Sequence, residues 1–322
     1  MIELNKCYCM DNLELMKQIE DNSVDLIYSD ILYGTGRDFG DYQDLKADRK
    51  VIENFYINRI KKMRRILKDT GSIYIQCDYR INHWIRCILD DVFGYEQFRN
   101  EIIWERTKVN KNTKNKFPDN TDKILFYAKS KDNKFNKPSE VTEILPYDIK
   151  LRKSGSASTR IDRPTMWYPF YYDVENDILS VDKKSDDYIE IFPIDAKGIE
   201  RRWEWGKAKS EKDINLLFVK EINNRYDIFR KSKDNKVVNI SNIWDMSLDS
   251  NMEYQTQKPK SLLKRIIETS SDENDIVADF FCGSGTAGVV AKELNRKYIL
   301  CDINERAIEI SKDRLNKTNE VI

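Results

Sequence analysis

A glycine-rich segment in the last quarter of the sequence has the residue types of a nucleotide-cofactor site. It reads Cys282-Gly283-Ser284-Gly285-Thr286, after a short apolar strand predicted at 275–278 and before a helix predicted at 289–294. Glycines let a backbone approach a ligand closely, and the first turn of a helix presents free amide N–H groups. Asp302 ends the next predicted strand, where its carboxylate could accept hydrogen bonds from ribose hydroxyls. The segment therefore predicts a site for a nucleotide-like cofactor.

The same glycines leave a second interpretation open. Gly283 to Gly288 also match the G-x-G-x-x-G pattern of dinucleotide-binding folds, so a dinucleotide-dependent oxidoreductase is an alternative. Those folds need further strand–helix units after this loop, whereas only one such unit and a last helix fit here. Asp279 and Phe281 precede the turn, and an aromatic ring there suits an adenosine or methionine moiety. We therefore expect the other strands of this sheet to come from upstream residues.

A second motif could bind an exocyclic amine. It reads Ser29-Asp30-Ile31-Leu32-Tyr33-Gly34-Thr35-Gly36 and lies at the C-terminal end of a buried strand predicted at 24–29. Ligands of open α/β sheets lie at such strand ends. Asp30 could accept one N–H of the amine, the Ile31 carbonyl could accept the other, and Tyr33 could stack on the ring. Alternatively, Asp30 caps a turn and Tyr33 is a core aromatic. A third motif, Gln257-Lys258-Pro259 at the start of a predicted helix, indicates little by itself.

The elements that must position these motifs alternate between helix and strand. We predict helices at 12–19, 48–67, 81–93 and 260–270, and strands at 24–29, 72–77, 101–104, 123–128, 275–278 and 297–302. Such alternation predicts an α/β fold with a parallel sheet covered by helices on both faces. From 107 to 245 the alternation is lost, and Trp, Tyr and charged residues become dense. We therefore predict three parts, 1–106, an inserted region 107–245 that contributes one core strand near 122–128, and 246–322.

Composition narrows the setting in which the protein works. Its 322 residues contain 55 Lys and Arg against 55 Asp and Glu, so a polyanion would have to bind at local basic patches. No signal peptide and no apolar run long enough to cross a bilayer is evident. The six cysteines lack metal-ligand spacing and the chain has one histidine, so we expect reduced thiols, no metal and a cytoplasmic location.

Together the motifs resemble the β group of amino-methylating DNA methyltransferases, in which the catalytic motif precedes the recognition region and the cofactor loop comes last. The resemblance covers Cys9 to Leu13, Asp30 to Tyr33, 257–259, 281–286 and Asp302, and the stretches 163–169 and 201–207 also look like modification subunits of restriction systems. It implies a Rossmann-like fold dependent on S-adenosylmethionine, with permuted motif order and an inserted target-recognition lobe.

The resemblance also implies a role for individual residues. The catalytic residues would be Asp30, Ile31, Leu32 and Tyr33. The residues that would bind S-adenosylmethionine are Asp11, Lys258, Asp279, Phe281, Cys282, Gly283, Ser284, Gly285, Thr286 and Asp302. Among these, Asp302 would hold the ribose, Asp11 the adenine amine, and Lys258 would lie near the methionine end.

The sequence departs from the family pattern at the catalytic motif. The family has Asp-Pro-Pro-Tyr, and Ile31 and Leu32 replace both prolines here; Phe280 likewise replaces the proline of Asp-Pro-Phe. Because Asp30 and Tyr33 are retained, we expect an active enzyme, and a catalytically inactive DNA-binding subunit is the alternative. Aspartate at the first motif position favours adenine N6 over cytosine N4 in this family. No Pro-Cys pair occurs, which argues against methylation of cytosine at carbon 5.

Basic residues in the middle of the chain are candidates for contacts with duplex DNA. They are Arg106, Lys108, Lys111 and Lys114, then Arg160, and then Arg201 and Arg202. Such side chains bind phosphates, which orients a protein on DNA. For the first stretch, a solvated loop is the alternative. The resemblance also allows a homodimer and a restriction endonuclease partner, and no membrane association is expected.

Overall fold

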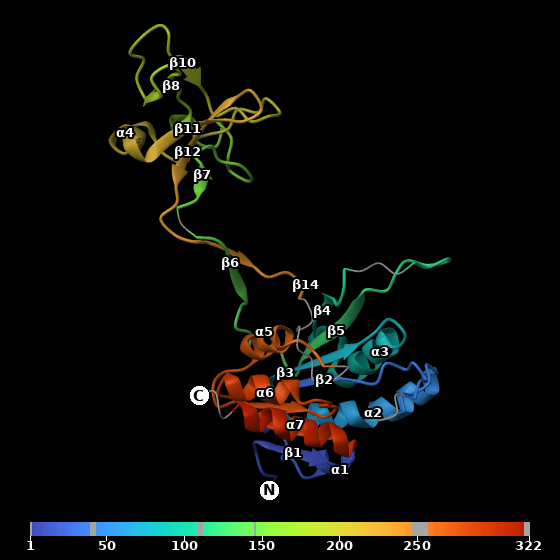
Figure 1. Cartoon of the computed structure of the whole chain (residues 1–322). Coiled ribbons are helices and arrows are strands. Elements are labelled where there is room, and N and C mark those ends of the chain that lie inside the picture. The colour runs from blue at the N-terminus through green and yellow to red at the C-terminus, as the bar shows by residue number, and fades with distance from the viewer. Residues whose placement is uncertain (1, 39–42, 109–111, 145, 247–256, 319–322) are drawn as a thin grey trace. The chain divides into compact units, whose positions relative to one another are not determined.

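A computed structural model of the protein describes residues 2–38, 43–108, 112–144, 146–246 and 257–318 (Figure 1). These residues divide into two compact units, one formed by 1–138 with 240–322 and the other by 139–239. The second unit is narrower than the inserted region predicted at 107–245. Residues 121–128, where the core strand was predicted, form a strand of the first unit's sheet, and residues 243–245 form another.

The first unit is built on a mixed sheet with the strand order β1-β16-β15-β2-β3-β5-β4-β14. Five neighbouring strands, from β1 to β3 in that order, run parallel. The strands are β1 (Lys6–Cys9), β2 (Val24–Asp30), β3 (Leu67–Cys77), β4 (Phe98–Glu105), β5 (Thr121–Ala128), β14 (Ile243–Asp245), β15 (Ile276–Asp279) and β16 (Lys297–Asp302). Strands from both ends of the sequence thus share one sheet, as the position of the glycine segment predicts.

Helices cover both faces of this sheet, which confirms the predicted α/β layering. The helices are α1 (Asn12–Lys17), α2 (Arg49–Ile66), α3 (Asn82–Phe93), α5 (Lys260–Ser270), α6 (Thr286–Glu293) and α7 (Glu305–Lys317) (Figure 1). Consecutive residues of a strand point to opposite faces. Accordingly Ile27 packs in the core under α1, α2 and α3, whereas Leu26 and Tyr28 pack in the core under α5, α6 and α7.

The prediction of a parallel sheet is wrong for one strand. β5 runs antiparallel to both of its neighbours, β3 and β4. A parallel pair needs a crossover connection, usually a helix, whereas an antiparallel pair can be joined by a loop. β4 and β5 are joined without an intervening helix among the described residues, so β5 returns in the opposite direction. This reversal brings the start of β5 to the edge of the sheet at which β2 and β3 end.

The second unit is a smaller, mainly β structure. Its strands form the orders β10-β8-β9, β11-β12-β7 and β13-β6. Its elements are β6 (Ser139–Glu143), β7 (Asp148–Lys150), β8 (Phe170–Asp173), β9 (Ile178–Ser180), β10 (Ile189–Ile191), α4 (Lys207–Lys212), β11 (Leu217–Glu221), β12 (Tyr226–Lys231) and β13 (Lys236–Asn239). An aromatic core holds it together, with Trp203 fully buried and edge-on to Phe170 at 5.2 Å between ring centroids.

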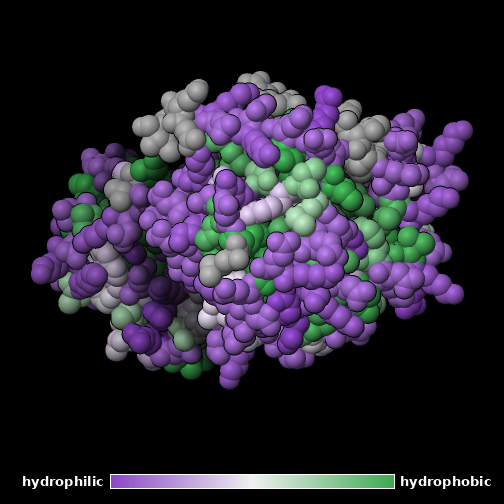
Figure 2. All heavy atoms as spheres, turned by 90° about the horizontal axis from the view of Figure 1, so that it is seen from below, coloured by the Kyte–Doolittle hydropathy of each residue, from purple (hydrophilic) through white to green (hydrophobic). Residues whose placement is uncertain are grey.

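One face of the molecule is largely hydrophilic. On the face drawn in Figure 2, charged and polar side chains predominate and apolar ones show in smaller areas between them. Within the described residues, no helix is both long enough and apolar enough to span a membrane.

Candidate active site

Three carboxylates lie along one edge of the parallel sheet. Asp302, Asp279 and Asp30 are the last residues of β16, β15 and β2, which are neighbours in that order. The carboxyl edge of a parallel sheet is where α/β proteins bind their ligands. The glycine segment and the Asp30 motif, far apart in sequence, therefore belong to one site.

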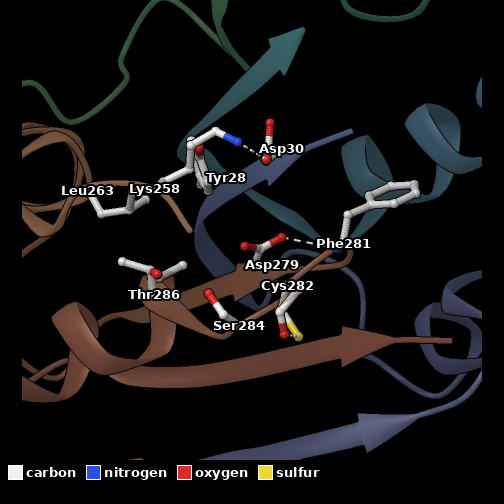
Figure 3. Close-up of a pocket in the computed structure, with 11 residues that line it drawn as sticks. Tyr28, Asp30, Lys258, Leu263, Asp279, Phe281, Cys282, Ser284 and Thr286 are labelled. Carbon is white, nitrogen blue, oxygen red and sulfur yellow. Dashed lines mark hydrogen bonds and ion pairs between the residues drawn. The ribbon is translucent and has the colours of Figure 1, made fainter. Parts of the chain in front are cut away.

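A hollow of about 350 Å³, its open mouth included, lies at this edge (Figure 3). Its lining combines residues of the glycine segment with residues of β2 and of the α5 region. The lining residues are Tyr28, Asp30, Lys258, Leu263, Asp279, Phe281, Cys282, Gly283, Ser284, Thr286 and Ala287. Of the residues predicted to bind the cofactor, Asp11, Gly285 and Asp302 lie outside this lining.

The glycine segment forms a tight turn between β15 and α6. Gly283 and Gly285 have φ angles of +49° and +73°, which favour glycine. A Cβ atom on Gly285 would lie 2.6 Å from the Ser311 hydroxyl oxygen, so α7 packs directly against the turn. A Cβ atom on Gly283 would meet nothing within 4 Å. The backbone at Gly283 is therefore open to a ligand, whereas Ser311 of α7 fills the space beside Gly285.

A buried arginine from α7 braces this turn. Arg314 donates from one guanidinium nitrogen to the Ser284 carbonyl oxygen at 2.6 Å, and to the Ser284 and Thr286 hydroxyl oxygens at 3.0 Å each. Ser311 on the same helix donates to the Gly283 carbonyl oxygen at 2.8 Å. The sequence motifs do not include these two residues. They lie one helical turn apart on α7, which no motif covers.

The two acidic residues of the cofactor half are held by backbone amides. Asp302 accepts hydrogen bonds from the amides of Gly283 and Asn304, each at 2.9 Å, and Asp279 accepts one from the Phe281 amide at 3.0 Å. Burial raises the pKa of Asp302 and raises that of Asp279 well above its usual value. Each carboxylate oxygen that accepts an amide keeps a further lone pair, so both residues can still accept from a ligand.

Asp11 lies at the start of α1, next to the carboxyl edge of β1. Its side chain accepts from the Leu13 amide at 2.8 Å and forms an ion pair with Arg59 of α2, also at 2.8 Å. Arg59 donates as well to Asn12, whose amide group donates to the Phe280 carbonyl oxygen at 2.9 Å. Arg59, which no motif indicated, thus ties the N-terminal motif to the glycine segment.

The Asp30 motif brings together the residues predicted for catalysis. The Tyr33 hydroxyl donates to Asp30 Oδ1 at 2.7 Å. Asp30 Oδ2 pairs with the ammonium group of Lys258, as Figure 3 shows. Lys258 Nζ also lies 5.6 Å from the Tyr33 ring centroid. Burial, and next the charge of Asp30, hold the pKa of Tyr33 well above its usual value. The hydroxyl therefore keeps its proton at neutral pH and acts as a donor.

The two residues that replace the family's prolines are each anchored. The Ile31 amide donates to the Gln76 carbonyl oxygen at 3.2 Å, and the Ile31 side chain is buried in the core under α1 to α3. The Leu32 carbonyl oxygen accepts from the Tyr56 hydroxyl at 3.2 Å. The strand β2 thus leads into the Asp30 motif without a break in its hydrogen bonding to β3.

Comparison with known proteins decides the family of this chain. The sequence matches the DNA methylase family N6_N4_Mtase over residues 24–313. It is 27% identical to the type II methyltransferase M.KpnI of Klebsiella pneumoniae, over 92% of this chain and 80% of that relative. It is 26% identical to the Mod subunit of the type III restriction-modification enzyme EcoPI of Escherichia phage P1, over 96% of this chain and 57% of that relative. The chain belongs to the DNA methylase family.

The solved structures agree with this assignment at the level of the fold. PvuII DNA methyltransferase (cytosine-N4-specific) superposes with a TM-score of 0.52 at 14% identity, over 98% of this chain and 90% of that chain. The methyltransferase fold that the sequence implied is therefore confirmed. Curated relatives differ in length, and this DNA methylase spans just over half of the EcoPI Mod subunit.

S-adenosylmethionine is the methyl donor of this DNA methylase family, and the residues present at the hollow fit it. Open space beside Gly283 admits a ligand close to the backbone, and Asp279 and Asp302 offer acceptors at adjacent strand ends. Phe281 supplies an aromatic ring on the lining of the hollow (Figure 3). The cofactor half of the site thus has the apolar face and the acceptors that an adenosine with a charged methionine tail requires.

The basic residues predicted to contact DNA in the first unit have diverse surroundings. Arg106 forms ion pairs with Asp122 at 2.8 Å and Asp119 at 3.5 Å, and Lys108 pairs with Asp245 at 2.5 Å. Lys114 is exposed, and Lys111 lies outside the described residues. Arg106 is therefore part of the site's own charge balance, whereas Lys114 presents its side chain to solvent.

The basic residues predicted to contact DNA in the second unit have partners within that unit. Arg160 pairs with Glu200 at 3.1 Å. Arg201 pairs with Asp195 at 2.8 Å and donates to the Ser158 hydroxyl, and Arg202 donates to the Ala157 carbonyl oxygen. These bonds tie residues 157–160 to residues 195–202. DNA contacts by these arginines stay a prediction.

Proposed function

We propose that the protein transfers a methyl group from S-adenosylmethionine to the N6 amine of adenine in duplex DNA. One observation supports this proposal above the others. The Asp30–Tyr33 pair and the glycine segment lie at the same sheet edge, and Lys258 lines the hollow between them. A group that binds an amine thus adjoins a group that binds a nucleotide-like cofactor.

The glycine segment and residues around it would hold the cofactor. When bound, S-adenosylmethionine supplies a methyl group on a positively charged sulfur. Asp302 would accept from its ribose hydroxyls, Asp11 would accept from its adenine amine, and Phe281 would pack on its adenine ring. Lys258, which is 14% exposed at the side chain, would attract its carboxylate. The turn braced by Arg314 and Ser311 keeps the Gly283 backbone in place for this contact.

Residues of the Asp30 motif would bind and activate the target adenine. A base inside a duplex must first be flipped out, at a cost of a few kcal/mol, and stacking on Tyr33 would recover about 1–3 kcal/mol of that. Asp30 and the Ile31 carbonyl would accept the two N–H groups of the amine. These bonds favour a pyramidal nitrogen with an exposed lone pair. That lone pair would form the new N–C bond to the methyl carbon as the methyl–sulfur bond breaks, and the electron pair of the broken bond would stay on sulfur, which leaves as a neutral thioether. The proton released from the nitrogen would pass to Asp30 or to water.

The choice of adenine rests on the resemblance rather than on the fold. Aspartate at the first motif position favours adenine in this family, and the present chain has Asp30 there. The structurally similar PvuII enzyme is described as cytosine-N4-specific, so the fold by itself does not exclude cytosine. Methylation of cytosine N4 is therefore the alternative within the same mechanism.

Duplex DNA would be the substrate, and a restriction subunit would be a partner. The likeness to a Mod subunit of a type III restriction-modification enzyme supports the second suggestion. Lys108, Lys114 and Arg160 are proposed DNA contacts with exposed side chains. We also propose a homodimer as the working assembly, following the family resemblance.

Mass spectrometry of nucleosides tests the proposed function. Unmethylated duplex DNA of varied sequence is incubated with S-adenosylmethionine and either the wild-type protein or its Asp30→Ala variant. N6-methyladenine that the Asp30→Ala variant fails to produce is the expected result. Asp25→Ala is the matched control, because Asp25 lies at the opposite end of the same strand and pairs with Lys68. It should retain activity if folded.

Each other outcome has a definite meaning. N4-methylcytosine would keep the mechanism and overturn the base assignment. If the wild-type protein binds S-adenosylmethionine and modifies no DNA, the inactive-subunit alternative, which Ile31 and Leu32 favour, replaces the proposal. Tight binding of a nicotinamide dinucleotide without binding of S-adenosylmethionine would refute the cofactor assignment.

A further inference from the structure

A second buried carboxylate, Asp122, lies beside the Asp30–Tyr33 pair. Asp122 is the second residue of β5 and is 1% exposed. Its Oδ2 atom lies 3.0 Å from the Tyr33 hydroxyl oxygen, and Asp30 Oδ1 lies 2.7 Å from the same oxygen. A single hydroxyl proton therefore faces two carboxylates, and only one of them can receive it at a time.

Gln76 on β3 favours donation of that proton to Asp30. Its Nε2 group donates to Asp122 Oδ2 at 2.9 Å and to the Tyr33 hydroxyl oxygen at 3.2 Å. The Tyr28 hydroxyl donates to Gln76 Oε1 at 2.6 Å, which keeps the amide nitrogen turned toward Tyr33. The Tyr33 hydroxyl oxygen also lies closer to Asp30 Oδ1, at 2.7 Å, than to Asp122 Oδ2, at 3.0 Å, which favours donation of its proton to Asp30.

Two cations balance the two carboxylates. Arg106, at the end of β4, forms an ion pair with Asp122 Oδ1 at 2.8 Å, and Lys258 pairs with Asp30 Oδ2. Burial raises the pKa of Asp122, while the charges of Lys258 and Arg106 lower it. Asp122 thus accepts hydrogen bonds at Oδ2 and has a cation beside Oδ1, and the residue does not line the cofactor hollow.

We propose that Asp122 is a positioning residue for methyl transfer and acts through the Tyr33 hydroxyl. This proposal rests on the function proposed above. With Gln76, Asp122 fixes the Tyr33 side chain, so that the ring meets the target base in one orientation. The Tyr33 hydroxyl then donates its hydrogen bond to Asp30 Oδ1. Asp30 Oδ2, which pairs with Lys258 in this structure, is left to receive the target amine.

The antiparallel direction of β5 makes this arrangement possible. β2 and β3 end at the carboxyl edge of the sheet, and β5 begins there because it runs the other way. The start of β5 therefore places Asp122 one residue beyond the Cys77–Lys123 pair, next to the end of β3. A parallel strand in this position would present its C-terminal residue at the edge instead.

A double-mutant cycle separates this role from a purely structural one. The variants are Asp122→Asn, which keeps the shape and removes the charge, Tyr33→Phe, which keeps the ring and removes the hydroxyl, and their combination. The single-turnover rate of DNA methylation and the Kd of S-adenosylmethionine are measured for each. A hydrogen bond to a charged group, lost from a transition state, corresponds to about a tenfold change in rate.

If Asp122 acts through the Tyr33 hydroxyl, each single variant slows the reaction about tenfold and the double variant slows it no further. The Kd of S-adenosylmethionine stays within about twofold of the wild type, since Asp122 lies outside the hollow. Multiplied losses of about a hundredfold in the double variant, or an unchanged rate for Asp122→Asn, would overturn the proposal. Absence of methylation by the wild type would instead refute the proposed function.

Two further variants keep the result interpretable. Asp25→Asn is the matched control, because Asp25 is 5% exposed and pairs with Lys68 at 2.8 Å at the opposite edge of the sheet. It should lower stability, leave the rate unchanged and combine with Tyr33→Phe without coupling. If Asp122→Asn fails to fold, a Gln76→Met and Tyr33→Phe cycle replaces it. Multiplied losses in that cycle would refute the role of the hydroxyl network as well.

Discussion

The packing of α7 against the cofactor turn predicts a large loss of stability for Gly285→Ala. Gly285 has a φ angle of +73°, and a methyl group there would lie 2.6 Å from the hydroxyl oxygen of Ser311 and 2.7 Å from its Cβ atom. Ser311 is fully buried and donates to the Gly283 carbonyl oxygen, so it cannot turn away freely. Either α7 must shift or the turn must open.

The expected magnitude follows from two contributions to the free energy of unfolding. A left-handed backbone conformation costs an alanine about 1–2 kcal/mol. Overpacking of a close contact such as the one with Ser311 adds about 1–3 kcal/mol. Gly285→Ala should therefore destabilise the protein by about 2–5 kcal/mol, a large share of the ~5–15 kcal/mol available to a typical domain.

Gly283→Ala is the matched control for this variant. Gly283 has a φ angle of +49°, but its added methyl group would meet nothing within 4 Å. Only the backbone contribution of about 1–2 kcal/mol remains. Urea denaturation of both variants, without cofactor, measures the difference. The packing contribution can be separated further with Ser311→Gly, which removes the clashing atoms.

Two results would refute the reasoning about Gly285. One is an equal loss of stability in Gly283→Ala and Gly285→Ala, since only the methyl group at Gly285 would contact Ser311. The other is the absence of coupling between Gly285→Ala and Ser311→Gly. The double variant should be more stable than the sum of the single effects predicts, by about 1 kcal/mol or more.

Three other variants test the site and the division into units. Burial raises the pKa of Asp279 in the folded protein well above its value in the unfolded chain. The stability that the protonated Asp279 contributes is therefore lost as pH rises through the folded pKa. Urea denaturation should show that Asp279→Asn becomes more stable relative to the wild type as pH rises from 5 to 8. Arg314→Met removes the hydrogen bonds to the cofactor turn. It should lower the free energy of unfolding, measured by urea denaturation, by about 2–3 kcal/mol, and should weaken the binding of S-adenosylmethionine in calorimetric titration. Trp203→Ala should cost the second unit about 3–5 kcal/mol by scanning calorimetry and leave the Kd of S-adenosylmethionine unchanged.

Local sequence patterns were sufficient to predict most elements of the first unit. The helix predicted at 48–67 is α2, Arg49–Ile66, and the strand predicted at 24–29 is β2, Val24–Asp30. In both, apolar residues recur at the period of the element, because one or both faces are buried. The direction of β5 was not predictable in this way. An apolar strand reads the same whichever way it runs, and its direction is fixed by pairing with strands distant in sequence.

The residues of the candidate site likewise fall into those that the sequence could predict and those that it could not. Residues within motifs were predicted, because a turn or a strand end requires particular residue types at fixed spacing, as Gly283 and Asp30 illustrate. Residues that act on these motifs from other elements were missed. Arg314, Arg59 and Asp122 each reach the site from a separate helix or strand. Their signal is a charged residue at a buried position, and burial becomes visible only when the chain is folded.

Ile31 and Leu32 show how the catalytic motif keeps its shape without the family's prolines. A proline at position 31 would have no N–H, whereas the Ile31 amide extends the pairing of β2 with β3 through the Gln76 carbonyl oxygen. The Tyr56 hydroxyl holds the Leu32 carbonyl oxygen from α2. Two hydrogen bonds to neighbouring elements thus restrain a backbone that proline rings would restrain covalently. Gln76 contributes both its carbonyl to Ile31 and its side chain to Tyr33, so the same residue fixes the backbone and the ring of the motif.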